Sequence, residues 1–146
     1  MTNDVPVTEQ RTDGRLTWQV WAGPANPVIT ENHPGEDILM TRVTITGPGV
    51  NEGWGFGGRP LYTGKTIDCL NSRCEDGTEF ILARFEPTLP AIHLETTRRT
   101  ITVDVRKLPT HFGLKFWAQP IDRGEEFVTA YGNQSEYRPL GWTPVH

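Results

Sequence analysis

A glycine-rich stretch, residues 53–58, is the first pattern in this sequence whose residue types and spacing could do chemistry. It reads Gly-Trp-Gly-Phe-Gly-Gly and has the G-x-G-x-x-G spacing of a dinucleotide-binding turn. In that motif a helix follows the third glycine, and its N-terminus binds the pyrophosphate. Residues 59–64 instead lack an apolar 3.6-residue period, and the sequence downstream alternates with period two. The context argues against a nucleotide site, and we expect no cofactor.

The same glycines can serve to display the two aromatic side chains between them, Trp54 and Phe56. Glycine adopts positive φ easily and lets another backbone approach closely, so residues 49–60 are interpreted as a loop. The two rings either fold back onto the open end of the protein body or contact another protein chain or a sugar ring. Four more side chains outside the expected core complete the predicted partner-binding set: Trp21, Tyr137, Leu140 and Trp142.

Two cysteines, Cys69 and Cys74, are separated by four residues. A disulfide between them would close a small loop and stabilise the fold by only about 2 kcal/mol. In a reducing cytoplasm both thiols would stay reduced and have a structural role. A metal site would need two further ligands, and the spacing to His93 and His111 matches no familiar zinc pattern. We therefore predict no metal site and leave the disulfide as an open alternative.

Catalytic signatures are weak throughout the sequence. His93-Leu94-Glu95 has the His-x-Glu pattern of zinc deaminases, but the Pro-Cys-x-x-Cys partner is missing. On a strand these two polar side chains simply share a solvated face. No G-x-S-x-G, H-E-x-x-H or Walker sequence occurs. A cysteine paired with His93 or His111 is the remaining enzymatic alternative, and we predict no catalytic residues.

Composition narrows the class of protein. The chain has 146 residues, 36% of them hydrophobic and 22% charged, with 15 Gly and 12 Pro, which is typical of one turn-rich globular domain. A net charge of −4 gives no electrostatic attraction for nucleic acid. No run approaches the roughly 18 apolar residues of a membrane span, and the N-terminus lacks the pattern of a secretory signal. We expect no nucleic-acid or membrane partner, and location in the cytoplasm of the producing cell.

Alternation of apolar and polar residues predicts about seven strands and no helix. Residues 79–86 are apolar on both faces, which favours a central strand. Residues 91–106 predict a hairpin in which Leu94 lies opposite Ile101 and Ile92 opposite Val103. The other expected strands are 15–22, 38–46, 113–119 and 125–131, the last two joined by a hairpin loop at 120–124. This pattern predicts an all-β fold, a single antiparallel β-sandwich of immunoglobulin-like or jelly-roll-like type.

The two ends of the chain are predicted to be extended arms around a sandwich domain of residues 15–132. Residues 1–14 and 133–146 are too poor in apolar residues to fold alone, so we expect them to gain order on another surface. Small acidic sandwiches with arms resemble capsid decoration or cement subunits and phage tail components in architecture and composition. The resemblance implies a non-enzymatic structural protein that binds other protein subunits, as a homo-oligomer or in a virion lattice. The alternative is a carbohydrate-binding module in which Trp54, Phe56 or Trp21 stacks on a sugar ring, and a small enzyme comes third.

Overall fold

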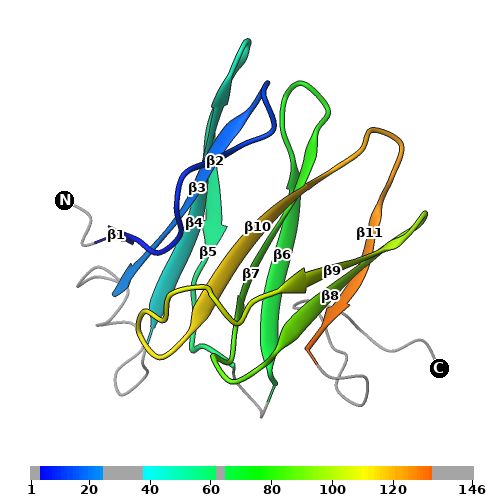
Figure 1. The fold of residues 1–146 in the computed structure, drawn as a ribbon. Helices are drawn as coiled ribbons and strands as arrows, with labels where there is room; N and C mark the ends of the chain where they lie inside the picture. The colour runs from blue at the N-terminus through cyan, green and yellow to red at the C-terminus, as the bar shows by residue number, and fades with distance from the viewer. Residues whose placement is uncertain (1–3, 25–37, 62–64, 133–146) are drawn as a thin grey trace.

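Strands make up all the regular secondary structure of the described residues. The computed structural model describes residues 4–24, 38–61 and 65–132, and these contain no helix. The all-β prediction is confirmed, with more strands than the roughly seven expected (Figure 1). The strands are β1 (Val5–Pro6), β2 (Arg11–Thr12), β3 (Thr17–Pro24), β4 (Leu39–Gly47), β5 (Val50–Phe56), β6 (Ile67–Arg73), β7 (Glu79–Phe85), β8 (Ala91–Thr96), β9 (Thr100–Asp104), β10 (Lys115–Ile121) and β11 (Phe127–Tyr131).

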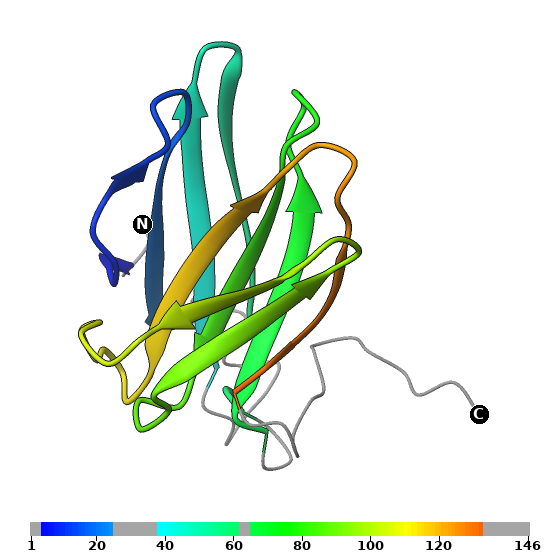
Figure 2. The ribbon, with the colours of Figure 1, turned by 45° about the vertical axis from the view of Figure 1, so that its right-hand side comes forward.

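The strands form three antiparallel sheets. Sheet A has the order β1-β3-β4-β5, with β2 also paired to β3, sheet B has the order β10-β7-β6, and sheet C has the order β11-β8-β9. In Figure 2 the strands β8 and β9 of sheet C run across the strands of sheet B. The antiparallel sandwich predicted from the alternation is therefore present.

Sheet B has an apolar cluster on each of its faces. All seven residues of β7 are buried, as the apolar run at 79–86 predicts. Phe80 and Leu82 belong to the cluster shared with sheet A, whereas Ile81, Ala83 and Phe85 belong to the cluster shared with sheet C. Successive side chains of a strand point to opposite faces, so one strand supplies both cores.

The hairpin predicted at residues 91–106 is confirmed residue by residue. Strands β8 and β9 pair with Leu94 opposite Ile101 and Ile92 opposite Val103. The backbone N of Thr96 donates to the backbone O of Arg99 (2.8 Å), so Thr97 and Arg98 are the two turn residues. This two-residue turn forms although it lacks the Gly or Asn that such turns favour.

The predicted hairpin between the last two strands is wrong. Strand β10 pairs with β7 in sheet B, and β11 pairs with β8 in sheet C, so the loop at 122–126 carries the chain from one sheet to the other. Pro120, which we placed in the loop, lies inside β10 opposite Phe80. An edge strand tolerates proline because its outward N–H needs no partner within the sheet.

Residues 4–14 form part of sheet A, which corrects the expectation of a free N-terminal arm. Strands β1 and β2 both pair with β3, and Val7 is 1% exposed within the core. Asp4 forms an ion pair with Arg42 of β4. The segment gains its order on its own sheet. The C-terminal arm, 133–146, lies outside the described residues, so its partner-binding residues Tyr137, Leu140 and Trp142 remain predictions.

Candidate interaction surfaces

The glycine-rich stretch is a strand and not a loop. It forms β5, which follows β4 through the two-residue turn Pro48-Gly49 and pairs with β4 along its whole length. Gly53 and Gly55 are exposed, while Trp54 and Phe56 are partly buried and pack against the cluster between sheets A and B. The period-two alternation of glycine with an aromatic residue was the signal for this strand. We missed it because glycine is disfavoured in strands.

Phe56 also contacts a buried cation, which supports the folded-back outcome for this pair of aromatic residues. The guanidinium of Arg84 lies 4.7 Å from the centroid of the Phe56 ring, an attractive cation–π geometry. No nucleotide-binding turn exists here, because the backbone at 50–56 is extended and no helix follows within the described residues.

Trp21 lies on the outer face of sheet A, as predicted, but within a local polar network. Its Nε1 donates a hydrogen bond to Thr44 Oγ1 (3.0 Å), and the guanidinium of Arg42 lies 5.2 Å from the ring centroid. Arg42 is in turn held by Asp4. A side chain of the protein itself therefore occupies one face of this ring, which weakens its case as a platform for a sugar.

The two cysteines are buried in different cores and do not form the disulfide left open by the sequence. Cys69 belongs to the cluster between sheets B and C, and Cys74 to the one between sheets A and B. Burial raises the pKa of the Cys74 thiol to about 11, and the nearby carboxylates of Glu52 and Asp76 add to the effect. At neutral pH this thiol is protonated and is a poor nucleophile.

Of the described histidines, His93 and His111 lie away from the apolar clusters that contain Cys69 and Cys74. His93 lies on the outer face of sheet C, where its Nδ1 is 3.1 Å from Thr102 Oγ1 and its ring stacks on Tyr131. His111 is in a turn before β10. The part of the chain that the structure describes contains no group of three His, Cys, Asp or Glu side chains arranged to hold a metal ion. The structure does not bring together the residues of the enzymatic alternative.

A buried arginine forms an ion pair within sheet B and also joins this sheet to sheet A. Arg84 of β7 is 2% exposed, and its Nε lies 3.3 Å from Asp68 Oδ2 on β6. Its Nη1 donates to the backbone O of Leu39 (2.7 Å), and its Nη2 donates to the backbone O of Gly58 (3.3 Å). Desolvation lowers the pKa of Arg84, and the charge of Asp68 opposes that shift. These bonds satisfy the guanidinium within the fold, so it is not available to a ligand.

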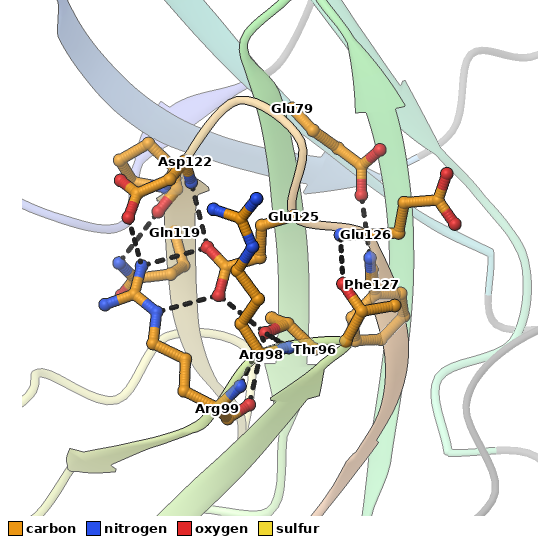
Figure 3. Close-up of polar contacts among 11 residues, drawn as sticks. Glu79, Thr96, Arg98, Arg99, Gln119, Asp122, Glu125, Glu126 and Phe127 are labelled. Carbon is orange, nitrogen blue, oxygen red and sulfur yellow. Dashed lines mark hydrogen bonds and ion pairs between the residues drawn. The ribbon is translucent and has the colours of Figure 1, made fainter.

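A second polar cluster, shown in Figure 3, joins the loop after β10 to the turn between β8 and β9. The side chain of Glu125 is 1% exposed and accepts two bonds from Arg99, from Nε (2.8 Å) and from Nη2 (3.0 Å). It also accepts bonds from Thr96 Oγ1 (2.5 Å) and from the backbone N of Asp122 (2.9 Å). The Arg99 bonds, followed by those from Thr96 and Asp122, lower the pKa of Glu125 to about 2. This carboxylate has a structural role, because its bonds hold the loop after β10 against the turn between β8 and β9.

The outer edge of β5 is the clearest candidate interaction surface. Among the described residues β5 pairs with β4 alone. In a hairpin with a two-residue turn the flanking residues, here Gly47 and Val50, form a hydrogen-bonded pair, and such pairs alternate along the ladder. The bond from the backbone N of Leu39 to the backbone O of Gly58 (3.1 Å) continues the same alternation of bonded pairs beyond the end of β5. The N–H and C=O groups of Asn51, Gly53 and Gly55 therefore point away from β4.

This edge lacks the features that normally prevent a strand from pairing with another chain. Such features are short length, charges, proline and bulges. β1 and β2 have two residues each, β10 contains Pro120, and β11 has a register shift between Phe127 and Thr129. The exposed residues of β5 are uncharged. Its one carboxylate, Glu52, instead accepts a bond from the backbone N of Glu75 (2.7 Å).

A strained turn before β10 exposes a large apolar side chain. Residues 111–114 form a tight turn in which Phe112 has φ 54° and Gly113 has φ 72°. Glycine suits this left-handed region, whereas a bulky aromatic residue is an outlier there. Phe112 is 49% exposed and belongs to neither apolar cluster. No sequence pattern marks this residue, because the strain depends on the backbone conformation alone.

No protein family, no curated protein and no solved structure shows significant similarity to this chain. Within the described residues no helix has the length and apolar character needed to cross a membrane.

Proposed function

We propose that this protein is a non-enzymatic interaction subunit, which binds neighbouring protein chains through the outer edge of β5. The observation that carries the proposal is the unprotected seven-residue edge strand with exposed backbone at Gly53 and Gly55. Glycine in a strand often marks a place where another backbone approaches closely. An extended segment added to such an edge gains main-chain hydrogen bonds, as in peptide recognition by strand addition.

The state of the charged groups supports a binding role over an enzymatic one. Three buried carboxylates, Asp68, Glu79 and Glu125, accept bonds that hold sheets and loops together. An active site needs a polar group that is left available for substrate. Cys74, with its raised pKa, is equally unsuited to nucleophilic chemistry.

Phe112 supports the same proposal from another part of the surface. Backbone strain persists where the surrounding structure enforces it, and it often marks a functional site. An exposed aromatic residue at the tip of a tight turn has the form of an interface anchor, since aromatic side chains dominate binding energy at such positions. An assembly subunit with two such surfaces can contact more than one neighbour.

The finer assignments remain predictions. A virion-type assembly, as a capsid decoration or tail component, follows only from the resemblance in architecture and composition. The carbohydrate alternative still has Trp21 as a partly buried ring, with Arg42 over it. The strand edge favours a protein partner, because its unpaired N–H and C=O groups match another backbone.

Sedimentation of the chain in an extract of the cells that produce it tests the proposal. We expect the 16.4 kDa chain to sediment in a larger complex of defined size, and Gly53→Lys to release it as a monomer. Thr100→Lys is the matched control, because it adds the same charge to an exposed position of the edge strand β9. A monomer in the unaltered extract, or equal behaviour of the two variants, would contradict the proposal.

A further inference from the structure

We infer that the occupant of the β5 edge is a second copy of this chain, paired antiparallel with β5 about a twofold axis at Gly53. The inference rests on the proposed function and specifies the partner. Twofold dimers are the commonest oligomers, and their interface requires a surface that is complementary to itself. The outer edge of β5 meets that requirement in hydrogen bonding, in side-chain size and in charge.

Hydrogen bonding sets the register. The groups that point outward belong to Asn51, Gly53 and Gly55, which are spaced by two residues around Gly53. With the axis at Gly53, this residue lies opposite its own copy, and Asn51 lies opposite Gly55 of the second copy. These are the residues that exchange both backbone bonds in an antiparallel ladder. The pairing therefore satisfies the outward N–H and C=O groups on both chains.

Side-chain size is compatible with this register. On the outer face, the two paired β5 strands would carry only glycine and Asn51, so the two backbones can approach without steric conflict. On the inner face Val50 lies opposite Phe56 of the second copy, and Glu52 lies opposite Trp54. Pairs of aromatic and β-branched residues are favourable across strands.

Charge also permits the pairing. Like charges directly opposite one another destabilise a sheet, and the one charged residue of β5, Glu52, does not meet its own copy in this register. A shifted register centred on residue 52 would place two carboxylates opposite each other. It would also bring together residues whose backbone groups are already bonded to β4. Charge repulsion at Glu52 and the backbone hydrogen-bond pattern therefore both favour a twofold axis at Gly53.

The test is a charge exchange at the axis, measured on the purified full chain by sedimentation equilibrium. Gly53 suits the substitution, since an added Cβ would meet its nearest atoms, Val43 O and Thr44 Cγ2, at 3.6 and 3.9 Å, which is ordinary contact. A short edge pairing buries little area, so we expect a roughly micromolar or weaker dimer. Gly53→Lys and Gly53→Glu should each raise its dissociation constant by about fivefold, because like charges then meet at the axis.

An equimolar mixture of the two variants gives the decisive result. Opposite charges then face each other, so we expect a mixed dimer whose dissociation constant lies within about twofold of the unaltered value. Thr100→Lys controls for net charge and should leave the dimer unchanged. Equal thermal unfolding of all variants shows that each is folded.

Two outcomes overturn the inference. One is an unaltered chain that stays monomeric when purified. The other is a mixed dimer whose dissociation constant is no lower than that of either variant alone. Either result can occur while the chain still sediments in a larger complex in the extract and Gly53→Lys still releases it. In that case the second copy fails as the occupant and the role of the β5 edge stands. A monomer in the extract as well would overturn both.

Discussion

Phe112 is a residue whose conformation costs the isolated protein stability. Its φ of 54° places a bulky side chain in the left-handed region, where the penalty for a residue with a Cβ is about 1–2 kcal/mol. Asparagine tolerates this region better. We expect Phe112→Asn to raise the free energy of unfolding by about 1 kcal/mol, measured by chemical denaturation.

Thr110→Asn is the control for this prediction, because it introduces the same side chain at an exposed position of the same loop. It should change stability by less than about 0.5 kcal/mol. A loss of stability in Phe112→Asn would mean that the aromatic ring stabilises the fold through its buried half. That result would contradict the proposal that Phe112 is an interface anchor.

The positions of some individual side chains could be predicted from the sequence, and those of others could not. Leu94 and Ile101 were placed opposite each other because two well-patterned strands define their own register. Trp54 and Phe56 were misplaced in a loop, since three glycines concealed the alternation that turns both rings inward. The strain at Phe112 could not be predicted, because it depends on the backbone angles of a single turn.

Among the connecting elements, the loop between β10 and β11 depends on the charge of Glu125. Its pKa in the folded protein is about 2, below the ordinary value of 4.5, because Arg99 and its other donors favour the ionised form. A carboxyl group with a lowered pKa stabilises the fold above its unfolded pKa, and that contribution disappears as the pH falls through the folded pKa. The stabilisation should therefore be complete above about pH 4.5 and be lost toward pH 2.

The measurement is the free energy of unfolding from pH 7 to pH 2 for the unaltered chain and for Glu125→Gln. We expect the variant to be less stable by about 2 kcal/mol at pH 7 and the two curves to converge toward pH 2. Glu126→Gln provides the control, because this neighbouring side chain is exposed. A constant difference between Glu125→Gln and the unaltered chain at every pH would show that the ion pair is not its source.

Strands were predicted correctly where the alternation is regular. Strand pairing was predicted wrongly where the chain passes from one sheet to another. Residues 79–86 were assigned to a central strand because both faces are apolar, and β7 is buried throughout. The passage from β10 to β11 has the length and turn residues of a hairpin, so local sequence could not show that these strands belong to different sheets. The short strands β1 and β2 carry too few residues to show a period.

For the whole molecule, the all-β class followed from composition and period, whereas the number of cores did not. Two apolar clusters on the two faces of sheet B require three sheets, and pairwise alternation specifies only which side of each strand is apolar. The same limit applies to the candidate site. An unpaired edge is a property of sheet order, so β5 could be recognised as an interaction surface only in the folded chain.

Amide hydrogen exchange along β5 tests the central claim most directly, by comparing the isolated monomer with the native assembly. The amide of Trp54 points toward β4 and serves as the reference, protected in both states. We expect the amides of Gly53 and Gly55 to exchange rapidly in the monomer and at least about tenfold more slowly in the assembly, where another strand covers them. Equal exchange of these two glycine amides in both states would contradict the account, because the edge of β5 would then bind no other chain.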